Sequence, residues 1–575
     1  LMPEKDAEQR ALARSILSPE RNGTLSAEQM LKAWQKIKRN VRSLHERIFF
    51  RPLLAAVSTL SRDEVVLSEQ AAQDRLAALG YRDPRGAMRH IKALTTGLSR
   101  SADIQRHLMP VLLGWFARGV DADAGLLGFR IVSESLGSTS WYLRMLRDSP
   151  AAAERLSQLL SSSRLMTDLL EDASASIAWL DKVADLKPLG EEALASEISS
   201  LLARHEDAAE AMRAVRYLRR RETLRTAMGW TLGIVDVEDT CAGLAAIDEC
   251  TIGAALQIAL RELQAAPEGA EPAEAEATAR EKLLTRIAVI GMGRLGGAEN
   301  GFGSDADVMF VHEPLDGADE DAAQEQAARI VNRTLALLKQ PVKPAIRAER
   351  PLEVDADLRP EGKQGAIVRS LDSYRSYYER WAETWEFQAL TRARPIAGDE
   401  ALGEAFVELI DPYRYPATFT PEQVQQIRRM KARVENERMP HGADRTRQLK
   451  LGRGGLSDVE WLVQLVQLRH AHAVPWLRTT STLKALNAAV EAGLVEAADA
   501  EILSGAWLLA TKIRGGNVLR GVRQSDTLPS GRADLEAIAR WCGYPAGSAR
   551  ALEEDYLRQT RNARKVYERL FFEEL

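Results

Sequence analysis

Apolar residues recur every three or four positions along most of this chain, which is the spacing of one face of an α-helix. Near the start the pattern runs through Trp34, Ile37, Val41, Leu44 and Ile48, and many positions between Val111 and Leu260 follow it. After about Asp399 it predicts further helices at Pro421–Arg438, Ser457–His472, Thr482–Ala492 and Ala546–Leu570. The chain is therefore predicted to be mainly helical.

The stretch 287–311, IAVIGMGRLGGAENGFGSDADVMFV, breaks this pattern. It places a glycine-rich turn and two carboxylates, Asp305 and Asp307, between two apolar runs typical of β-strands. Alternate residues of a strand share a face, so the two acids point the same way, about 6.5 to 7 Å apart along the backbone. The apolar run 308–311 predicts a central strand buried on both faces. A divalent cation would compensate the two acids, and the alternative for an isolated pair is a solvated strand end.

The glycines Gly291, Gly293 and Gly296 also match the G-x-G-x-x-G fingerprint of dinucleotide-binding domains. That fold requires a crossover helix after the third glycine, in a unit of about 30 residues. The segment 297–304 instead holds three glycines and an asparagine with no apolar stripe, which predicts a loop. A nicotinamide-binding domain is therefore disfavoured.

A second acidic strand is predicted after a helix from Asp319 to about Lys339. Within the segment Arg350–Pro360, Leu352, Val354 and Ala356 alternate with Glu353, Asp355 and Asp357. A half-buried strand of this kind carries its carboxylates on one face, and beside the first strand it could supply a third ligand to a two-cation site for phosphoryl transfer. The alternative is an acidic edge strand that protects the sheet from aggregation.

Composition narrows the class of protein. The chain of 575 residues is 45% hydrophobic and 28% charged, which is typical of globular proteins with several domains. Its net charge of −5 argues against a general nucleic-acid binder. There is no apolar run of 18 residues and no amino-terminal signal, so no membrane association is predicted. The three cysteines, Cys241, Cys250 and Cys542, form neither a disulfide framework nor a zinc motif, which favours a reducing cytoplasm.

Four segments in this order resemble the glutamine synthetase adenylyltransferase family, within the superfamily of nucleotidyltransferases that includes DNA polymerase β. They are 291–307 (GMGRLGG leading to GSDAD), 353–362 (EVDADLRPEG), 385–395 (WEFQALTRARP) and 449–460 (LKLGRGGLSDVE). Members of that family are two-headed enzymes: one head removes AMP from a tyrosine of glutamine synthetase and the other adds it. The motif GFGSDAD resembles the second, adenylylating head.

The resemblance implies a fold that is mainly α, with one α/β nucleotidyltransferase domain containing a small mixed sheet, flanked by helical bundles. Residues 1–110 are expected to be a helical segment, the tail of a preceding half, and the chain is expected to be a fragment of a larger protein. A helical domain would follow over 111–262, the catalytic domain over 263–400, and a C-terminal helical bundle over 401–575. Residues 263–280, rich in Glu, Ala and Pro, are predicted to be an exposed connector.

The resemblance also assigns the acids. Asp305 and Asp307 would be metal ligands and Asp355 the third carboxylate, together holding two Mg²⁺, with Mn²⁺ as the alternative ion, while ATP is the substrate. Asp355 is also the expected base for the tyrosine hydroxyl, whose pKa is near 10 when free. Asp357 stands where the family often has a basic residue, so its role stays open.

Other residues are candidates for binding the nucleotide. The backbone amides of Gly296 and Gly297 and the hydroxyl of Ser304 are suited to the triphosphate. Arg359 or Lys363 could neutralise the departing pyrophosphate, although each could equally be a solvated surface charge. Lys450 precedes a helix with a capping-box pattern at Ser457 and Glu460 and is either site-facing or an ordinary loop lysine. The aromatic series Tyr374, Tyr377, Tyr378, Trp381 and Trp385 favours helix packing over an adenine platform.

The implied function is transfer of AMP to glutamine synthetase, with a PII-type signalling protein as a possible further partner. Three alternatives stay open at this point. They are the adenylyl-removing head of the same enzyme, a uridylyltransferase of a signalling protein, and a non-catalytic helical scaffold. The shared acids do not decide the direction of the reaction, but retention of all three argues against the scaffold.

Overall fold

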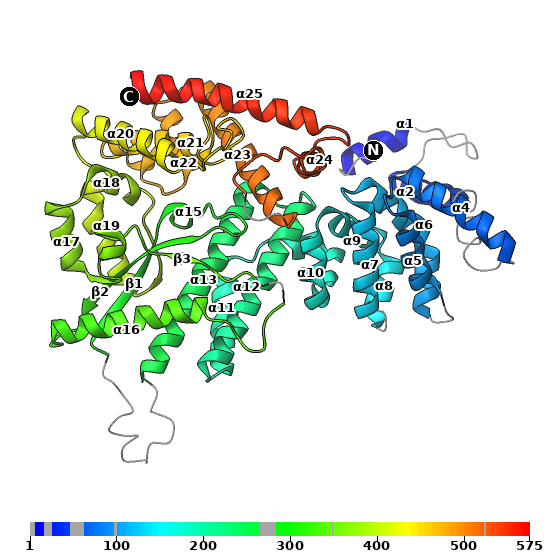
Figure 1. Ribbon diagram of the computed structural model, residues 1–575, viewed down its shortest axis with the longest axis horizontal. Coiled ribbons are helices and arrows are strands. Elements are labelled where there is room, and N and C mark those ends of the chain that lie inside the picture. Colours follow the sequence, from blue (N-terminus) through cyan, green and yellow to red (C-terminus); the bar gives the residue numbers. More distant parts are fainter. Residues whose placement is uncertain are drawn as a thin grey trace, which may run out of the picture. The chain divides into compact units, whose positions relative to one another are not determined.

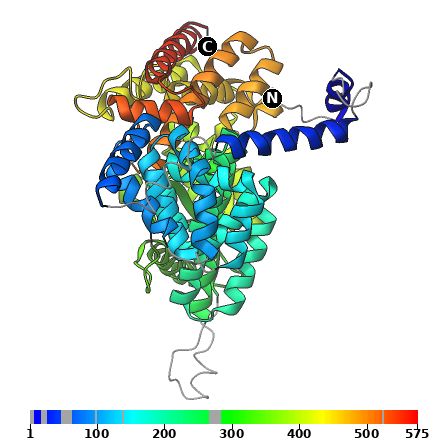
Figure 2. The same cartoon turned by 90° about the vertical axis from the view of Figure 1, so that its right-hand side faces the viewer.

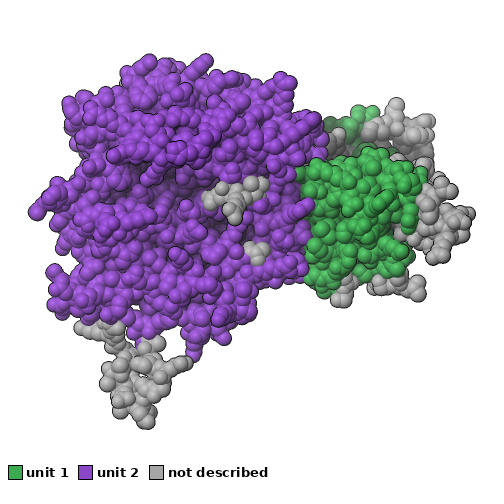
Figure 3. Space-filling view, viewed as in Figure 1, with its two compact units in different colours: residues 1–161 green, residues 162–575 purple. Residues whose placement is uncertain are grey.

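The computed structural model describes residues 6–15, 26–45, 62–96, 100–136, 139–264, 283–347, 349–521 and 525–574. The chain divides into two compact units, residues 1–161 and residues 162–575, which are coloured separately in Figure 3. Most of the expected connector 263–280 lies outside the described residues. The finer division into four segments therefore stays a prediction.

The described part of unit 1 is helical. Its helices are α1 (Asp6–Ser15), α2 (Ala27–His45), α4 (Arg62–Leu79), α5 (Pro84–Thr95), α6 (Arg100–Arg118), α7 (Ala122–Leu136), α8 (Ser140–Asp148) and α9 (Pro150–Ser162). The predicted stripe on α2 forms a helix, but Trp34, Ile37 and Val41 are exposed.

Unit 2 begins with helices that lead to the sheet. They are α10 (Arg164–Asp172), the 3₁₀ turns η2 (Ser174–Asp181) and η3 (Val183–Leu186), α11 (Glu191–Arg204), α12 (Ala208–Thr231) and α13 (Val237–Gln264). Among the described residues α13 is long and apolar enough to cross a membrane, yet 72% of its most apolar window is buried inside the protein, as in a core helix.

A five-stranded mixed sheet lies at the centre of unit 2, in the order β3-β2-β1-β5 with β4 also paired to β2. The strands are β1 (Thr285–Gly291), β2 (Ala306–Pro314), β3 (Val354–Asp355), β4 (Arg369–Ser370) and β5 (Arg394–Gly398). Strand β1 pairs antiparallel with β2 and β5, whereas β3 and β4 pair parallel with β2. The mixed sheet in a mainly helical chain confirms the predicted fold class.

Strand β2 is buried on both faces, as its apolar run predicts. Val308 and Phe310 face a core shared with α13 and with α16 (Glu320–Lys339), which is capped by Asp319. Met309 and Val311 face the opposite core. That core includes side chains of α17 (Leu371–Arg380) and α19 (Glu400–Arg414), which are joined through α18 (Thr384–Leu390).

The remaining helices build the C-terminal bundle around a core of its own. They are α20 (Pro421–Glu437), α21 (Leu456–His470), α22 (Thr482–Glu491), α23 (Ala497–Leu519), α24 (Arg532–Trp541) and α25 (Ala549–Glu568), with the turn η5 (Pro475–Leu477) and the π-helical end η6 (Arg569–Glu574). In Figures 1 and 2 these helices, yellow to red, gather at one end of unit 2, and α11–α13 lie at the other. All four helices predicted after Asp399 are present within a few residues of their expected bounds.

Candidate active site

The three predicted acids lie at one end of the sheet. Asp307 is the second residue of β2, and Asp305 directly precedes that strand. Because β3 runs parallel to β2 with Asp355 in register with Asp307, both side chains stand at the same level of adjacent strands. The amide of Ala306 donates to the carbonyl of Glu353 at 2.8 Å and fixes this register. The structure therefore brings the predicted acids together in what we call the acid row: Asp305, Asp307 and Asp355.

The second acidic strand is shorter than its alternation predicts, because only Val354 and Asp355 pair with β2. Pro351 and Pro360 bracket the segment and cannot donate to a strand ladder. The alternation itself holds, since Leu352 and Ala356 are buried while the acids between them are exposed.

Burial acts against negative charge in the acid row. It raises the pKa of Asp307 to about 6, and the carboxylates of Asp355 and Asp305 add to the rise, while Lys450 opposes it. The pKa of Asp305 is also raised, first by burial and then by the neighbouring Glu353 carboxylate. A cation placed among these groups would reverse both effects.

The side chains of the acid row have the chemistry to bind a divalent cation, but they lie too far apart to hold one as they stand. All of its donors are carboxylate oxygens, the ligands that Mg²⁺ prefers, and their mutual repulsion would be relieved by a cation. Within the described part of the chain, no group of three or more His, Cys, Asp or Glu side chains converges closely enough to hold an ion as it stands. Binding would therefore draw the carboxylates inward.

The glycine-rich turn follows β1 and packs directly on this row. Its helix, α15 (Gly293–Gly296), has only four residues, and β1 and β2 are antiparallel. A dinucleotide-binding unit needs a long crossover helix between parallel strands, so that alternative is excluded. Gly293 adopts a positive φ of 52°, and a Cβ atom there would lie 2.3 Å from Oδ2 of Asp307. This glycine is required by the close approach of the turn to the acid.

Gly296 and Gly297 are buried behind the turn. Their amides donate to the carbonyls of Met292 and Gly293 at 2.8 and 3.2 Å. A Cβ atom on Gly296 would lie 1.9 Å from the carbonyl oxygen of Arg392. Any contribution of these two glycines to nucleotide binding is therefore through the shape of the turn, because both N–H groups already have acceptors.

Ser304 holds the loop that leads into the acid row. Its hydroxyl accepts a hydrogen bond from the amide of Gly301 at 3.0 Å, and its own amide donates to the carbonyl of Gly301 at 3.1 Å. The side chain lines two cavities beside Asp305, so it stays a candidate for binding phosphate.

The predicted cations after β3 are engaged in their own loop. Arg359 donates to the carbonyls of Gly365 and Ala356, at 3.0 and 2.7 Å. Lys363 is an exposed residue that pairs with Asp357 at 3.3 Å. Asp357 also lies 3.6 Å from Arg359. The uncertain fourth acid thus has two basic partners in this loop.

A cleft of about 760 Å³ opens beside the acid row. Gly293 and Lys450 lie on its wall next to Asp307, and Trp385 and Trp461 supply aromatic surface. Other lining residues include Arg433, Arg438, Met430, Val434, Leu451 and Glu460. Lys450 thus lies on the wall of this cleft, and its role in binding stays a prediction.

Two further expectations meet mixed outcomes. In the aromatic series Tyr374 and Tyr378 are buried in the core, as favoured, but Trp381 is exposed and Trp385 lines the cleft. The capping box at Ser457 is wrong, because α21 starts after Gly455 and has no side-chain cap. The Ser457 hydroxyl, buried in the first turn, instead accepts a hydrogen bond from the Lys431 ammonium at 3.1 Å.

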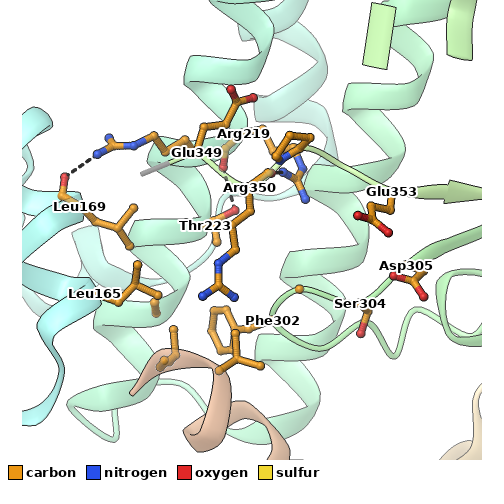
Figure 4. Close-up of a pocket in the computed structure, with 16 residues that line it drawn as sticks. Leu165, Leu169, Arg219, Thr223, Phe302, Ser304, Asp305, Glu349, Arg350 and Glu353 are labelled. Atoms are coloured by element: carbon orange, nitrogen blue, oxygen red, sulfur yellow. Dashed lines mark hydrogen bonds between the residues drawn. The ribbon is translucent and has the colours of Figure 1, made fainter. Parts of the chain in front are cut away.

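A second cavity, of about 350 Å³, reaches the other end of the acid row. Figure 4 shows the Arg350 guanidinium inside it, close to Phe302, with Asp305 and Glu353 along one side. The walls come from α10, α12 and the end of α23.

Two ion pairs, one buried and one partly buried, tie segments beside the acid row to neighbouring helices, and the sequence interpretation missed them. Arg392 pairs with Glu299 at 2.8 Å, and the same carboxylate accepts from the hydroxyl of Thr482 at 2.9 Å. Arg394 pairs with Glu249 of α13. The motif Thr391-Arg-Ala-Arg-Pro395 carried the signal for both arginines, but their acidic partners are far away in the sequence.

An acid row on adjacent parallel strands, next to a short glycine turn and enclosed by helices, defines a nucleotidyltransferase-type domain. Residues 153–409 match the family model described as glutamate-ammonia ligase adenylyltransferase. Residues 428–571 match the model described as PII-uridylyltransferase. Over residues 153–409 the chain is therefore similar to the glutamate-ammonia ligase adenylyltransferase family.

Relatives of high similarity carry one shared description, bifunctional glutamine synthetase adenylyltransferase/adenylyl-removing enzyme. The relative from Leifsonia xyli is 48% identical over 100% of this chain and 54% of its own length. The one from Streptomyces avermitilis is 47% identical over 100% of this chain and 57% of its own length. The one from Mycobacterium avium is 42% identical over 99% and 56%. The chain thus spans about half the length of the curated relatives it matches.

Proposed function

We propose that this chain transfers AMP from ATP to a tyrosine of glutamine synthetase and thereby regulates nitrogen assimilation. The observation that carries the proposal is the register of β2 and β3, which sets Asp307 beside Asp355 with Asp305 next to them. Similarity to the family model and the names of the relatives support the choice of nucleotide and protein acceptor.

Two Mg²⁺ ions held by Asp305, Asp307 and Asp355 would stabilise the charge that develops on the phosphates. Mn²⁺ is the alternative ion, because it also takes oxygen ligands. The tyrosine oxygen forms a bond to the α-phosphorus while the bond from that phosphorus to the bridging oxygen of the β-phosphate breaks, and pyrophosphate leaves. Asp355, exposed at the end of β3, would accept the phenolic proton.

The nucleotide is proposed to occupy the cleft of about 760 Å³. Lys450 lies at its inner end close enough to Asp307 to oppose the rise in that acid's pKa, so it can also neutralise a phosphate. Trp385 and Trp461 offer flat surface for adenine. Ser304, Arg359 and Lys363 stay candidates for phosphate contacts, the last two only after release from their loop partners.

The removing reaction is the second candidate, because the relatives' shared name includes it. It would use the same acid row with inorganic phosphate attacking the tyrosyl adenylate. A PII-type protein is a proposed regulatory partner on the basis of the match over residues 428–571. The three free cysteines fit a reducing cytoplasm, which is the proposed location.

The test is incubation of the chain with α-³²P-ATP, Mg²⁺ and unmodified glutamine synthetase, with Asp307→Asn as the matched control. Label on the synthetase with the native chain only is the expected result. Release of ADP from adenylylated synthetase on addition of phosphate, without forward transfer, would assign the removing reaction. Absence of both reactions would favour the non-catalytic helical scaffold.

A further inference from the structure

The Arg294 guanidinium is an incompletely satisfied charge beside the acid row. Its Nε donates to the carbonyl of Glu299 at 2.8 Å. Its two terminal nitrogens are buried and have no oxygen or nitrogen acceptor among the residues that the structure describes. The Trp507 ring lies 5.6 Å from its Cζ, and a cation–π contact does not satisfy N–H donors. Leaving a buried charged donor unbonded costs about 1–3 kcal/mol or more.

A second buried cation stands behind it. Arg514 pairs with Asp526 at 2.6 Å. Its pKa is lowered, first by burial and then by the positive charge of Arg294. The other acid that acts on Arg514 is Glu460, at longer range. Burial raises the pKa of the nearby Cys241 thiol to about 11, while the charge of Arg294 and a hydrogen bond with its side chain oppose the rise. The thiol is therefore neutral, and it offers Arg294 a weak sulfur acceptor but no counter-charge.

These groups surround a small cavity of about 20 Å³ under the loop 301–304. Arg294, Arg514, Ser304 and Thr511 all line it, and the Thr511 hydroxyl is buried and also without a hydrogen-bond partner in the described residues. Such a volume accommodates one group the size of a water molecule, which is also the size of one phosphate oxygen. The Arg294 nitrogens can only donate hydrogen bonds and the Thr511 hydroxyl can also donate one, so the cavity suits a negatively charged oxygen.

The place of this cavity in the chain connects it to the reaction. Ser304 lies on its wall and directly precedes Asp305 of the acid row. Of the other cations near the acids, Arg359 is committed to two carbonyls of its own loop and Lys363 to Asp357, while Lys450 lies on the wall of the cleft proposed for the nucleotide. Arg294 therefore keeps the donors that the leaving group of a nucleotidyl transfer needs.

We propose that Arg294, supported by Arg514, is an anion site for the terminal phosphates of the nucleotide and for the pyrophosphate that leaves. The site rests on the proposed nucleotidyl transfer. When the bond between the α-phosphorus and the bridging oxygen breaks, the electron pair stays on pyrophosphate, and charge-assisted hydrogen bonds from Arg294 stabilise it. One oxygen enters the cavity and the rest of the group stays on the side of the acid row.

The experiment compares thermal unfolding with and without magnesium pyrophosphate in the native chain and in Arg294→Met. Pyrophosphate is expected to raise the melting temperature of the native chain. Arg294→Met removes a buried charge with unmet donors, so its ligand-free melting temperature is expected to stay equal or to rise, while the pyrophosphate shift is lost. Arg375→Met, which breaks only an exposed ion pair with Asp372 on α17, is the matched control and keeps the shift. Arg294→Lys retains the positive charge but lacks the two terminal guanidinium nitrogens, so it keeps part of the pyrophosphate-induced rise in melting temperature.

The same variants give a second measurement, inhibition of the transfer reaction by pyrophosphate. A rise of about tenfold or more in the inhibition constant of Arg294→Met is expected, equal to about 1.4 kcal/mol. Equal pyrophosphate protection of the native chain and Arg294→Met would overturn the site. Equal protection by phosphate or sulfate at the same concentration would also overturn it, as general anion binding. Neither melting result depends on glutamine synthetase, so failure of the proposed function remains separately visible.

Discussion

Two loops reach the acid row, and they treat charge in opposite ways. The loop after β3, residues 356–365, pairs its acid Asp357 with its own Arg359 and Lys363. The turn after β1, residues 291–297, holds Arg294 with two nitrogens for which no described residue supplies an oxygen or nitrogen acceptor. Charges that find partners within a few residues serve to hold a loop together. A charge that is buried at a cost and left unmet is available for a ligand.

The largest effect expected from this contrast separates two acids of a single segment. Asp355→Asn should lower AMP transfer at least about a hundredfold, the scale of losing one preorganised charge-stabilising group at a reacting centre. Asp357→Asn should lower the rate of AMP transfer by less than about tenfold, because its partners are the two basic residues of the loop. Initial rates with saturating ATP measure both. Equal losses would show that Asp357 belongs to the site.

The second test removes the buried ion pair between Arg392 and Glu299, which lies next to the glycine turn. Arg392→Met leaves Glu299 as a buried, unpaired carboxylate, which is expected to lower the free energy of unfolding by about 3–5 kcal/mol. Urea unfolding measures it. Arg375→Met is the control, since its pair with Asp372 is exposed and should contribute about 0–1 kcal/mol. A loss below about 1 kcal/mol for Arg392→Met would mean that the turn does not depend on this pair.

The third test uses pH. Folding raises the pKa of Asp307 from an ordinary value of about 4 to about 6, so the folded chain holds this proton more tightly than the unfolded chain. Its contribution to stability is full below about pH 4 and is lost as the pH rises through about 6, a change of about 2–3 kcal/mol. Without divalent cations, Asp307→Asn should become progressively more stable than the native chain over that range. A constant difference between the two unfolding curves would contradict the raised pKa.

The smallest expected effect is at Lys363. Its side chain is 79% exposed and pairs with Asp357, so Lys363→Met should change the KM for ATP by less than about twofold. Steady-state kinetics measure it, with Lys450→Met as the contrasting variant, expected to raise that KM clearly. If Lys363→Met raises the KM for ATP as much as Lys450→Met does, Lys363 leaves Asp357 and contacts the nucleotide.

Much of the fold could be predicted from local pattern. The helices after Asp399 and the buried strand β2 follow from periodicity and apolar runs alone. Alternation predicted that Asp305 and Asp307 share a face, whereas the choice of Asp355 among the acids of the second strand came from the family resemblance. Strand β3 was predicted too long, since alternation continues through residues that have no partner strand.

Residues whose role depends on distant partners could not be predicted. Glu299 lies in a loop, and only the fold brings it to Arg392 and Thr482. Arg294 stands inside a recognised motif, yet its importance comes from the absence of an oxygen or nitrogen acceptor among the described residues, which no sequence pattern reports. Gly296 and Gly297 suggested phosphate binding, but their N–H groups are used by the turn itself.

The pair between Glu299 and Arg392 also has a mechanical meaning. Glu299 follows the glycine turn, Arg392 precedes β5, and Thr482 begins α22 of the C-terminal bundle. On the opposite side, Arg394 of β5 is tied to Glu249 of α13. The sheet that carries the acid row is thus linked to the helices on both sides through β5 and the residues that precede it. The sheet and the C-terminal bundle should melt as a single cooperative unit, and a force applied at α22 should reach the acid row without passing through a hinge.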